Sequence, residues 1–269
     1  MKHRLFSHLK HHLKFGVLAL ALSGVTGCAT LQSHVVDNAE WQQDRRLADV
    51  ALQSGRPESA ITIYRQQLTQ APENTELMYR LGAAYNQSGD TELALHFLHR
   101  AADKAAEANA PVADAAWHGH ILRELGRAHL AQGNAEAAEA ALQQAADLRP
   151  QDAETLNALG ACRALQQDYA RARTAFVAAV AVAPDHLEYR NNLAMSWILD
   201  AQPRKGIEIL HPLYLRGTST VKMRQNLALA FAMTGDLVTA RMIAKQDLSP
   251  AELTNNMDFY RQWQQGEVL

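Results

Sequence analysis

Apolar and small residues recur along most of this chain with a period of 34 residues. Within each period the apolar positions fall three or four residues apart in two blocks, which is the spacing of one face of an amphipathic helix. The pattern therefore predicts two helices per period. The clearest recurrences are Leu125 and Leu159, Gly126 and Gly160, Ala138 and Ala172, Leu142 and Phe176, Ala145 and Ala179, and Pro150 and Pro184.

The same frame extends in both directions and is broken once, by a ten-residue insertion at 109–118. A helix pair cannot cover its own apolar face, so successive pairs must stack, and we predict an all-α solenoid of antiparallel helix pairs. Glycines at the middle of several units end the first helix, and prolines near the end stop the second. The units are 41–74, 75–108, 119–152, 153–186, 187–220 and 221–254.

The repeating positions resemble the tetratricopeptide repeat. The second unit carries the marks of that family as Leu81, Gly82, Tyr85, Ala94, Leu98 and Ala101. The family's tryptophan at the fourth position is absent, and Met78, Leu122 and Leu156 stand there instead. The resemblance implies a right-handed superhelix in which the first helix of each pair lines a concave surface.

The N-terminus has the features of an export signal. Basic residues without an acid precede a short apolar run at 15–23, which is followed by Val25-Thr26-Gly27-Cys28. This stretch resembles the lipobox of bacterial lipoproteins, which implies cleavage after residue 27 and acylation, with palmitate among the chains, at Cys28. Ala29 after the cysteine implies, by the same resemblance, anchoring in the outer membrane facing the periplasm. The alternative is a soluble exported protein.

Three segments lie outside the repeats. Residues 28–40 show no sustained periodicity and are interpreted as a tether, which would reach about 40 Å if extended. Residues 255–269 are expected to form a helix that caps the last repeat through Met257, Phe259, Tyr260 and Trp263. The insertion 109–118 is interpreted as a spacer between the second and third units, with a partner contact as the alternative.

Composition and charge limit the fold and the function classes that suit this chain. Gly (14) and Pro (8) are scarce in 269 residues, and 48% of the residues are apolar, which suits a helical fold with a core. Residues 1–27 carry four Lys or Arg and no acid, so cleavage changes the net charge from −2 to −6 and leaves an acidic body. An acidic body argues against nucleic-acid binding. Two cysteines exclude a disulfide scaffold.

No catalytic or metal-binding pattern is evident. Four of the twelve histidines lie in the signal, His118 and His120 point to different sides of a helix, and His96 and His99 lack further ligands. Cys162 has no evident base to activate it and is expected to be a buried structural thiol. We therefore expect a non-enzymatic protein without cofactor or metal.

The concave surface implied by the repeat is the candidate binding site. Toward the C-terminus one strip of it becomes apolar, which favours docking of a protein partner. Asn192 and Asn226, at the sixth position of the last two units, resemble asparagines that bind an extended peptide backbone in related repeats. The alternative is that the chain's own C-terminal helix covers the strip. The candidate groove residues are Ala161, Leu165, Asn192, Met195, Ile198, Leu199, Asn226, Leu229 and Met233.

The C-terminal sequence carries a further set of distinctive residues, namely Arg224, Asn226, Leu227, Ala228, Asp247, Leu248, Pro250, Ala251, Glu252, Asn256 and Arg261. In these residues it resembles the Tad (tight adherence, Flp-type) pilus-assembly lipoproteins. The resemblance implies an outer-membrane lipoprotein that helps to place or stabilise the secretin pore, with the secretin as candidate partner. The alternative function is a general envelope scaffold, for instance an adaptor for murein enzymes or outer-membrane protein assembly.

Overall fold

A computed structural model describes residues 26–107, 109 and 111–265, with side chains from Ala39 onward except those of Ala115 and Gln265. The expected signal peptide, 1–27, lies outside these residues except for its last two. The side chain of Cys28 is also outside them, so its acylation stays a prediction. The described chain is α-helical without strands, and it divides after Pro72 into two compact units, which we describe separately. The all-α expectation is confirmed.

The first unit is one antiparallel helix pair, α1 (Thr26–Gln53) and α2 (Pro57–Gln70). Its core contains Ala48, Ala60 and Tyr64, which are fully buried. Two polar contacts tie the helices together. The Tyr64 hydroxyl donates to Asp49 Oδ1 at 2.6 Å, and the Gln67 amide donates to the carbonyl of Trp41 at 2.8 Å.

The segment 28–40 differs from the expected extended tether. It is part of α1, which continues without a break into the first repeat. A helix rises 1.5 Å per residue, so thirteen residues span about 20 Å instead of about 40 Å. Helix continuation needs no sustained apolar face when the following residues already provide a helix nucleus, which is why periodicity missed it.

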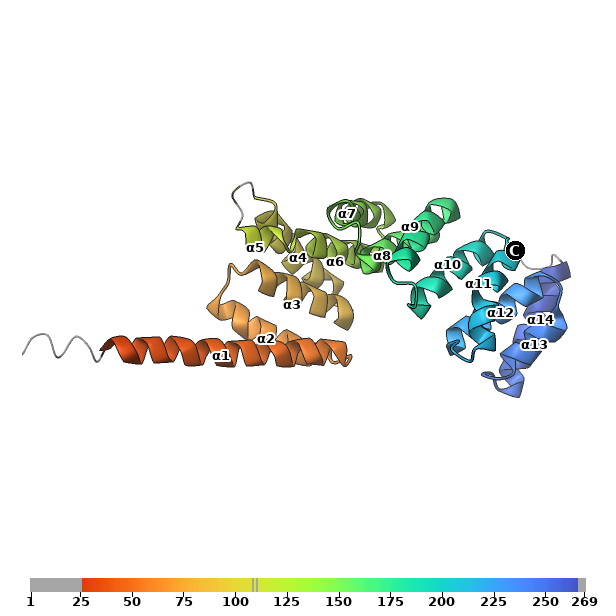
Figure 1. Ribbon diagram of the computed structural model, residues 1–269, viewed down its shortest axis with the longest axis horizontal. Helices are drawn as coiled ribbons and strands as arrows, with labels where there is room; N and C mark the ends of the chain where they lie inside the picture. The colour runs from red at the N-terminus through yellow and green to blue at the C-terminus, as the bar shows by residue number, and fades with distance from the viewer. Residues whose placement is uncertain (1–25, 108, 110, 266–269) are drawn as a thin grey trace, which may run out of the picture. The chain divides into compact units, whose positions relative to one another are not determined.

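The second unit consists of five helix pairs that follow one another in chain order (Figure 1), each helix packing against its partner and against the next pair. The short helix α5 (Val112–Ala115) lies in the insertion. The pairs are α3 (Thr75–Ser88) with α4 (Thr91–Ala105), α6 (His118–Ala131) with α7 (Ala135–Leu148), α8 (Ala153–Leu165) with α9 (Tyr169–Val182), α10 (Leu187–Leu199) with α11 (Pro203–Leu215), and α12 (Val221–Met233) with α13 (Leu237–Ala244).

Local chemistry sets the helix ends. Side chains of Asn74, Asp152 and Asp168 accept backbone N–H bonds at the starts of α3, α8 and α9, which satisfies donors that have no partner within the helix. Gly89 and Gly235 adopt positive φ angles of 84° and 92° where first helices end. These residues account for the sharp reversals between the two helices of a pair.

Glycine allows the helices of a pair to approach closely. A Cβ added at Gly160 in α8 would lie 2.6 Å from Cδ1 of Phe176 in α9, so the ring occupies the space that a side chain would need. Gly82 and Gly126 hold the same position in α3 and α6 and face leucines in the same way. In α10 the arrangement is reversed, because Gly206 of α11 receives Ile198 of α10.

The C-terminal helix α14 (Pro250–Gln265) caps the last pair and begins five residues earlier than expected. Ser249 and Glu252 bond reciprocally at its start, with Pro250 in the first turn, which is a strong helix-initiation signal. Met257 and Tyr260 are buried against α12 and α13, whereas Phe259 and Trp263 are 44% and 38% exposed. Two of the four residues expected to cover the end therefore do so, and they are joined by Leu253.

Across the described helices, none is both long and apolar enough to cross a membrane.

Candidate functional site

The first helices of the repeats form a continuous layer in the second unit. Each of α3, α6, α8, α10 and α12 contacts the next one, so equivalent positions of successive helices are neighbours. We call the solvent-facing side of this layer the A-helix surface. It is the side to which the sequence assigned the candidate groove residues.

Most candidate groove residues reach solvent. Leu165 at the end of α8 is 72% exposed, and Leu199, its equivalent in α10, is 51% exposed. Burying large apolar side chains of this kind on a partner is favourable by roughly 25 cal/mol per Å². The structure therefore leaves an apolar stripe open on α8 and α10. The candidates that are partly buried beside it are Ala161, Asn192, Met195, Asn226, Leu229 and Met233.

Ile198 is a wrong assignment, because it is fully buried. Its Cγ1 would lie 2.5 Å from a Cβ added at Gly206, so the side chain packs over the glycine of the second helix and away from the surface. Other pairs have alanine at this place of the second helix, for instance Ala138 and Ala172. The glycine was the only sequence signal for the inward turn of Ile198.

The two asparagines bond to neighbouring helices. The side-chain amide of Asn192 donates to Asn157 Oδ1 at 3.0 Å, and that of Asn226 donates to Asn191 Oδ1 at 2.7 Å. Each bond joins the sixth position of one first helix to the fifth position of the preceding first helix. These amides thus form a ladder across α8, α10 and α12. This differs from the expected binding of a peptide backbone, because each of these two side-chain amides already donates one hydrogen bond to a neighbouring helix.

The N-terminal part of the A-helix surface is charged and internally paired. Arg123 in α6 reaches Asp152 and Glu154 at 3.1 Å, and Arg127 reaches Glu154 at 3.0 Å. Arg123 and its neighbour Glu124 are 8% and 5% exposed. Burial alone would lower the pKa of Arg123, but Glu154 and Glu124 raise it above its ordinary value. This network joins α6 to the start of α8, and sequence inspection missed it because its acids come from a turn and a different repeat.

The insertion ends in an aromatic cluster. Trp117 lies 5.1 Å from the ring centroid of Tyr79 and 5.5 Å from that of His120, and the Arg80 guanidinium lies 5.5 Å from the indole centroid. Burial and the charge of Glu124 raise the pKa of Tyr79. Trp117 therefore packs the end of the insertion against side chains of α3 and α6.

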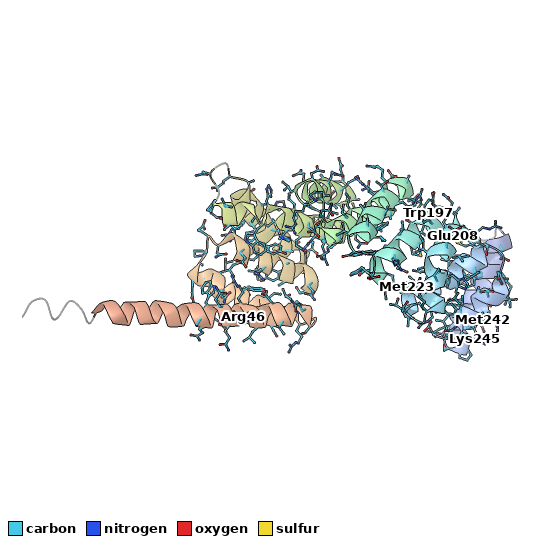
Figure 2. All side chains as sticks on the ribbon, in the orientation of Figure 1. Arg46, Trp197, Glu208, Met223, Met242 and Lys245 are labelled. Carbon is cyan, nitrogen blue, oxygen red and sulfur yellow. The ribbon has the colours of Figure 1, made fainter. Side chains whose placement is uncertain are left out.

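The remaining candidate chemistry is structural in character. Cys162 is fully buried, and burial raises the pKa of its thiol, which disfavours the reactive thiolate. Trp197 (labelled in Figure 2) is covered by the Arg173 guanidinium at 4.1 Å. Within residues 39–265, as far as their side chains are described, His, Cys, Asp and Glu form no group of three or more that suits a metal ion.

The residues of the C-terminal motif hold the end of the solenoid together. Arg224 binds Asp247 through two N–H groups, with Nε at 2.7 Å from Oδ2, and also donates to the Ser219 carbonyl at 2.7 Å. Asp247 is 8% exposed, and Arg224 holds its pKa below the usual range. Leu227 and Ala228 are buried in the same core. These motif residues therefore stabilise the C-terminal end of the solenoid.

Comparison with known proteins agrees with this architecture. Two tetratricopeptide-repeat family models match residues 51–116 and 123–186. Residues 51–116 and 123–186 thus carry tetratricopeptide repeats, and the described chain has the fold of a tetratricopeptide-repeat solenoid. Such repeats serve as scaffolds for protein–protein interaction, so the A-helix surface is a candidate site for a protein partner. A search of curated protein sequences gave no match.

Solved structures resemble this chain in fold. TTC0263 from Thermus thermophilus is 20% identical, with a TM-score of 0.58 over 71% of this chain and 98% of its own. PilF from Pseudomonas aeruginosa is 16% identical, with a TM-score of 0.64 over 85% and 98%. A tetratricopeptide-repeat protein from Parabacteroides merdae is 11% identical, with a TM-score of 0.59 over 87% and 89%. At these identities the likeness concerns the fold alone.

Proposed function

We propose that this protein is a lipid-anchored scaffold at the outer membrane, facing the periplasm, that holds a component of a Tad-type pilus machine. The exposed stripe of Leu165 and Leu199 carries the proposal of a docking site. The order of basic segment, apolar run and Cys28 supports the anchor, and the C-terminal resemblance supports the pilus machine. The likeness to PilF adds agreement in fold only. The secretin is the candidate partner.

The stripe suits an apolar face of a partner helix or strand. Leu165 and Leu199 still expose more than half of their side chains, and Met195 and Met233 beside them are partly exposed. Methionine side chains adapt to irregular partner surfaces. Completing the burial of both leucines would contribute about 2 kcal/mol or more, and placing carboxylates there would oppose docking.

The stripe is tested with the double variant Leu165→Glu/Leu199→Glu. Because both side chains are exposed, we expect unchanged helical circular dichroism and melting. Co-purification of the secretin, measured by immunoblot of envelope extracts, should fall about thirtyfold or more. The matched control is Leu215→Glu/Val238→Glu, at positions 70% and 81% exposed on second helices. Equal secretin recovery with both double variants would refute docking at the stripe.

The anchor is tested separately. Cys28→Ser removes the thiol to which the lipid would attach, so the precursor should remain uncleaved or leave the outer-membrane fraction. Normal outer-membrane fractionation of this variant would contradict the lipoprotein proposal and would leave the docking stripe untouched.

A further inference from the structure

An open pocket of about 260 Å³ lies between α9, α10 and α11 of the second unit. Its walls are apolar and include Val180, Leu193 and Leu213. Two arginines also line it, Arg190 from α10 and Arg216 from the C-terminal end of α11. The presence of two guanidinium groups in an apolar pocket needs an explanation, because a charged group is costly to place in apolar surroundings.

The repeat itself explains why the pocket is open. Arg190 occupies the fourth position of its unit, where the second, third and fourth repeats carry Met78, Leu122 and Leu156, which are 0%, 7% and 9% exposed. Leu156, for example, lies in one buried cluster with Leu142 and Ala146 of the preceding repeat, so the apolar side chain there fills the space between the two repeats. An unpaired guanidinium is costly to bury. In the fifth repeat the corresponding space therefore stays accessible to solvent.

The sixth repeat shows what an arginine at this position requires. There Arg224 binds the Asp247 carboxylate through two N–H groups and the Ser219 carbonyl through a third. The residue 34 positions before Asp247 is Leu213, which has no carboxylate. For the described part of the chain, the structure gives neither Arg190 nor Arg216 a side-chain hydrogen bond or an ion pair.

We propose that this pocket binds the carboxylate of an aspartate or glutamate side chain of a partner protein, together with a neighbouring aliphatic side chain. The carboxylate takes the role at Arg190 that Asp247 has at Arg224, and the aliphatic group fills the space beside Leu193 and Leu213. Guanidinium groups bind carboxylates with two parallel hydrogen bonds. The site is separate from the stripe of Leu165 and Leu199, and it does not depend on the proposed pilus role.

The charge of the lining selects a single carboxylate. Glu208, on α11 and labelled in Figure 2, also lines the pocket, so two arginines and one glutamate give a net charge of +1. One carboxylate neutralises that charge. A polyphosphate or a highly acidic tract would bring further negative charge next to Glu208. The apolar walls favour an aliphatic neighbour over a second acid.

The test uses blocked peptides and the full chain with ¹³C-labelled leucine methyl groups. The probes are Ac-Ala-Leu-Glu-Leu-Ala-NH₂, the same peptide with glutamine for glutamate, and hexanoate. We expect the glutamate peptide to shift the methyl signals of Leu193 and Leu213 saturably, with the glutamine peptide about tenfold weaker. Equal affinity of the two peptides, or binding of hexanoate alone, would overturn the proposal.

Variants assign the effect to the arginines. Arg190→Gln and Arg216→Gln should each weaken the glutamate peptide about tenfold, whereas Arg241→Gln, which removes an exposed arginine from α13, should leave it unchanged. Arg190→Leu should fill the space as Leu156 does, abolish the methyl shifts and leave the melting temperature equal or higher. Unchanged affinity in both arginine-to-glutamine variants, or a clear loss of stability in Arg190→Leu, would contradict the proposed site.

Discussion

The pair formed by Arg224 and Asp247 makes a measurable prediction for the C-terminal motif. Asp247→Asn keeps the size of the side chain but removes its charge and one acceptor oxygen. Asp247 is 8% and Arg224 21% exposed, so the lost interaction is only partly screened by water. A hydrogen bond to a charged group contributes about 1.5–3 kcal/mol, and the remaining acceptor retains part of this. We expect the last repeat to lose about 2 kcal/mol.

The loss should be local, because each repeat contacts only its neighbours. Amide hydrogen exchange of α13 and α14 is therefore the appropriate assay, and 2 kcal/mol corresponds to exchange about thirtyfold faster. Exchange in α6 and α7 should not change. The matched control is Asp258→Asn, which breaks the ion pair between Asp258 and Arg261. These two side chains are 48% and 52% exposed. Its effect should be below about 1 kcal/mol.

The pH dependence gives an independent check. Arg224 holds the pKa of Asp247 below its ordinary value of 3.8 in the folded chain. The stabilisation is therefore present above the unfolded pKa and is lost as the pH falls through the lower folded value. The difference between wild type and Asp247→Asn should shrink below about pH 4. A difference that persists at low pH, or an equal effect of Asp258→Asn, would refute the reasoning.

Three further predictions concern the core, the amide ladder and the titration of a histidine. Gly160→Ala should lower the free energy of unfolding by about 1–2 kcal/mol in denaturant titrations, because the clash with Phe176 outweighs the better helix propensity of alanine; increased stability would contradict it. Asn226→Ala should cost about 1–3 kcal/mol by leaving the buried side chain of Asn191 without its partner, and a neutral effect would argue against the ladder. Burial and His99 lower the pKa of His129 below 6.5, so NMR should show a titration midpoint under that value, and its contribution to stability should decrease as the pH falls below 6.5.

Much of the fold follows from the repeat. The spacing of Leu125, Gly126, Ala138 and Leu142 is enough to predict two helices, their antiparallel order and the close approach between them. The exposure of Leu165 was also predicted, because the resemblance to the repeat family assigns this position to the concave side of the first helices. The helical conformation of residues 28–40 was not predictable, because a helix without an apolar face leaves no periodic signal in the sequence.

The candidate site depended on tertiary contacts. Ile198 and Leu199 are adjacent in sequence and equally apolar, yet one is buried over Gly206 and the other is 51% exposed. The bonds of Asn192 and Asn226 depend on which side chain of the neighbouring helix lies within reach. Sequence assigns residues to the faces of a helix, whereas the packing of neighbouring helices decides which of those faces stay open.

The chain by itself thus determined that it folds as stacked helix pairs, because each pair repeats an apolar face that it cannot cover alone. Only the tertiary structure decided what the two arginines at the fourth position do. Arg224 is paired with Asp247, which the turn before α14 brings within 2.7 Å, whereas Arg190 faces a pocket where the equivalent residue is Leu213. The physical reason is that pairing of a charge depends on a partner distant in sequence, while helix formation depends on neighbours along the chain.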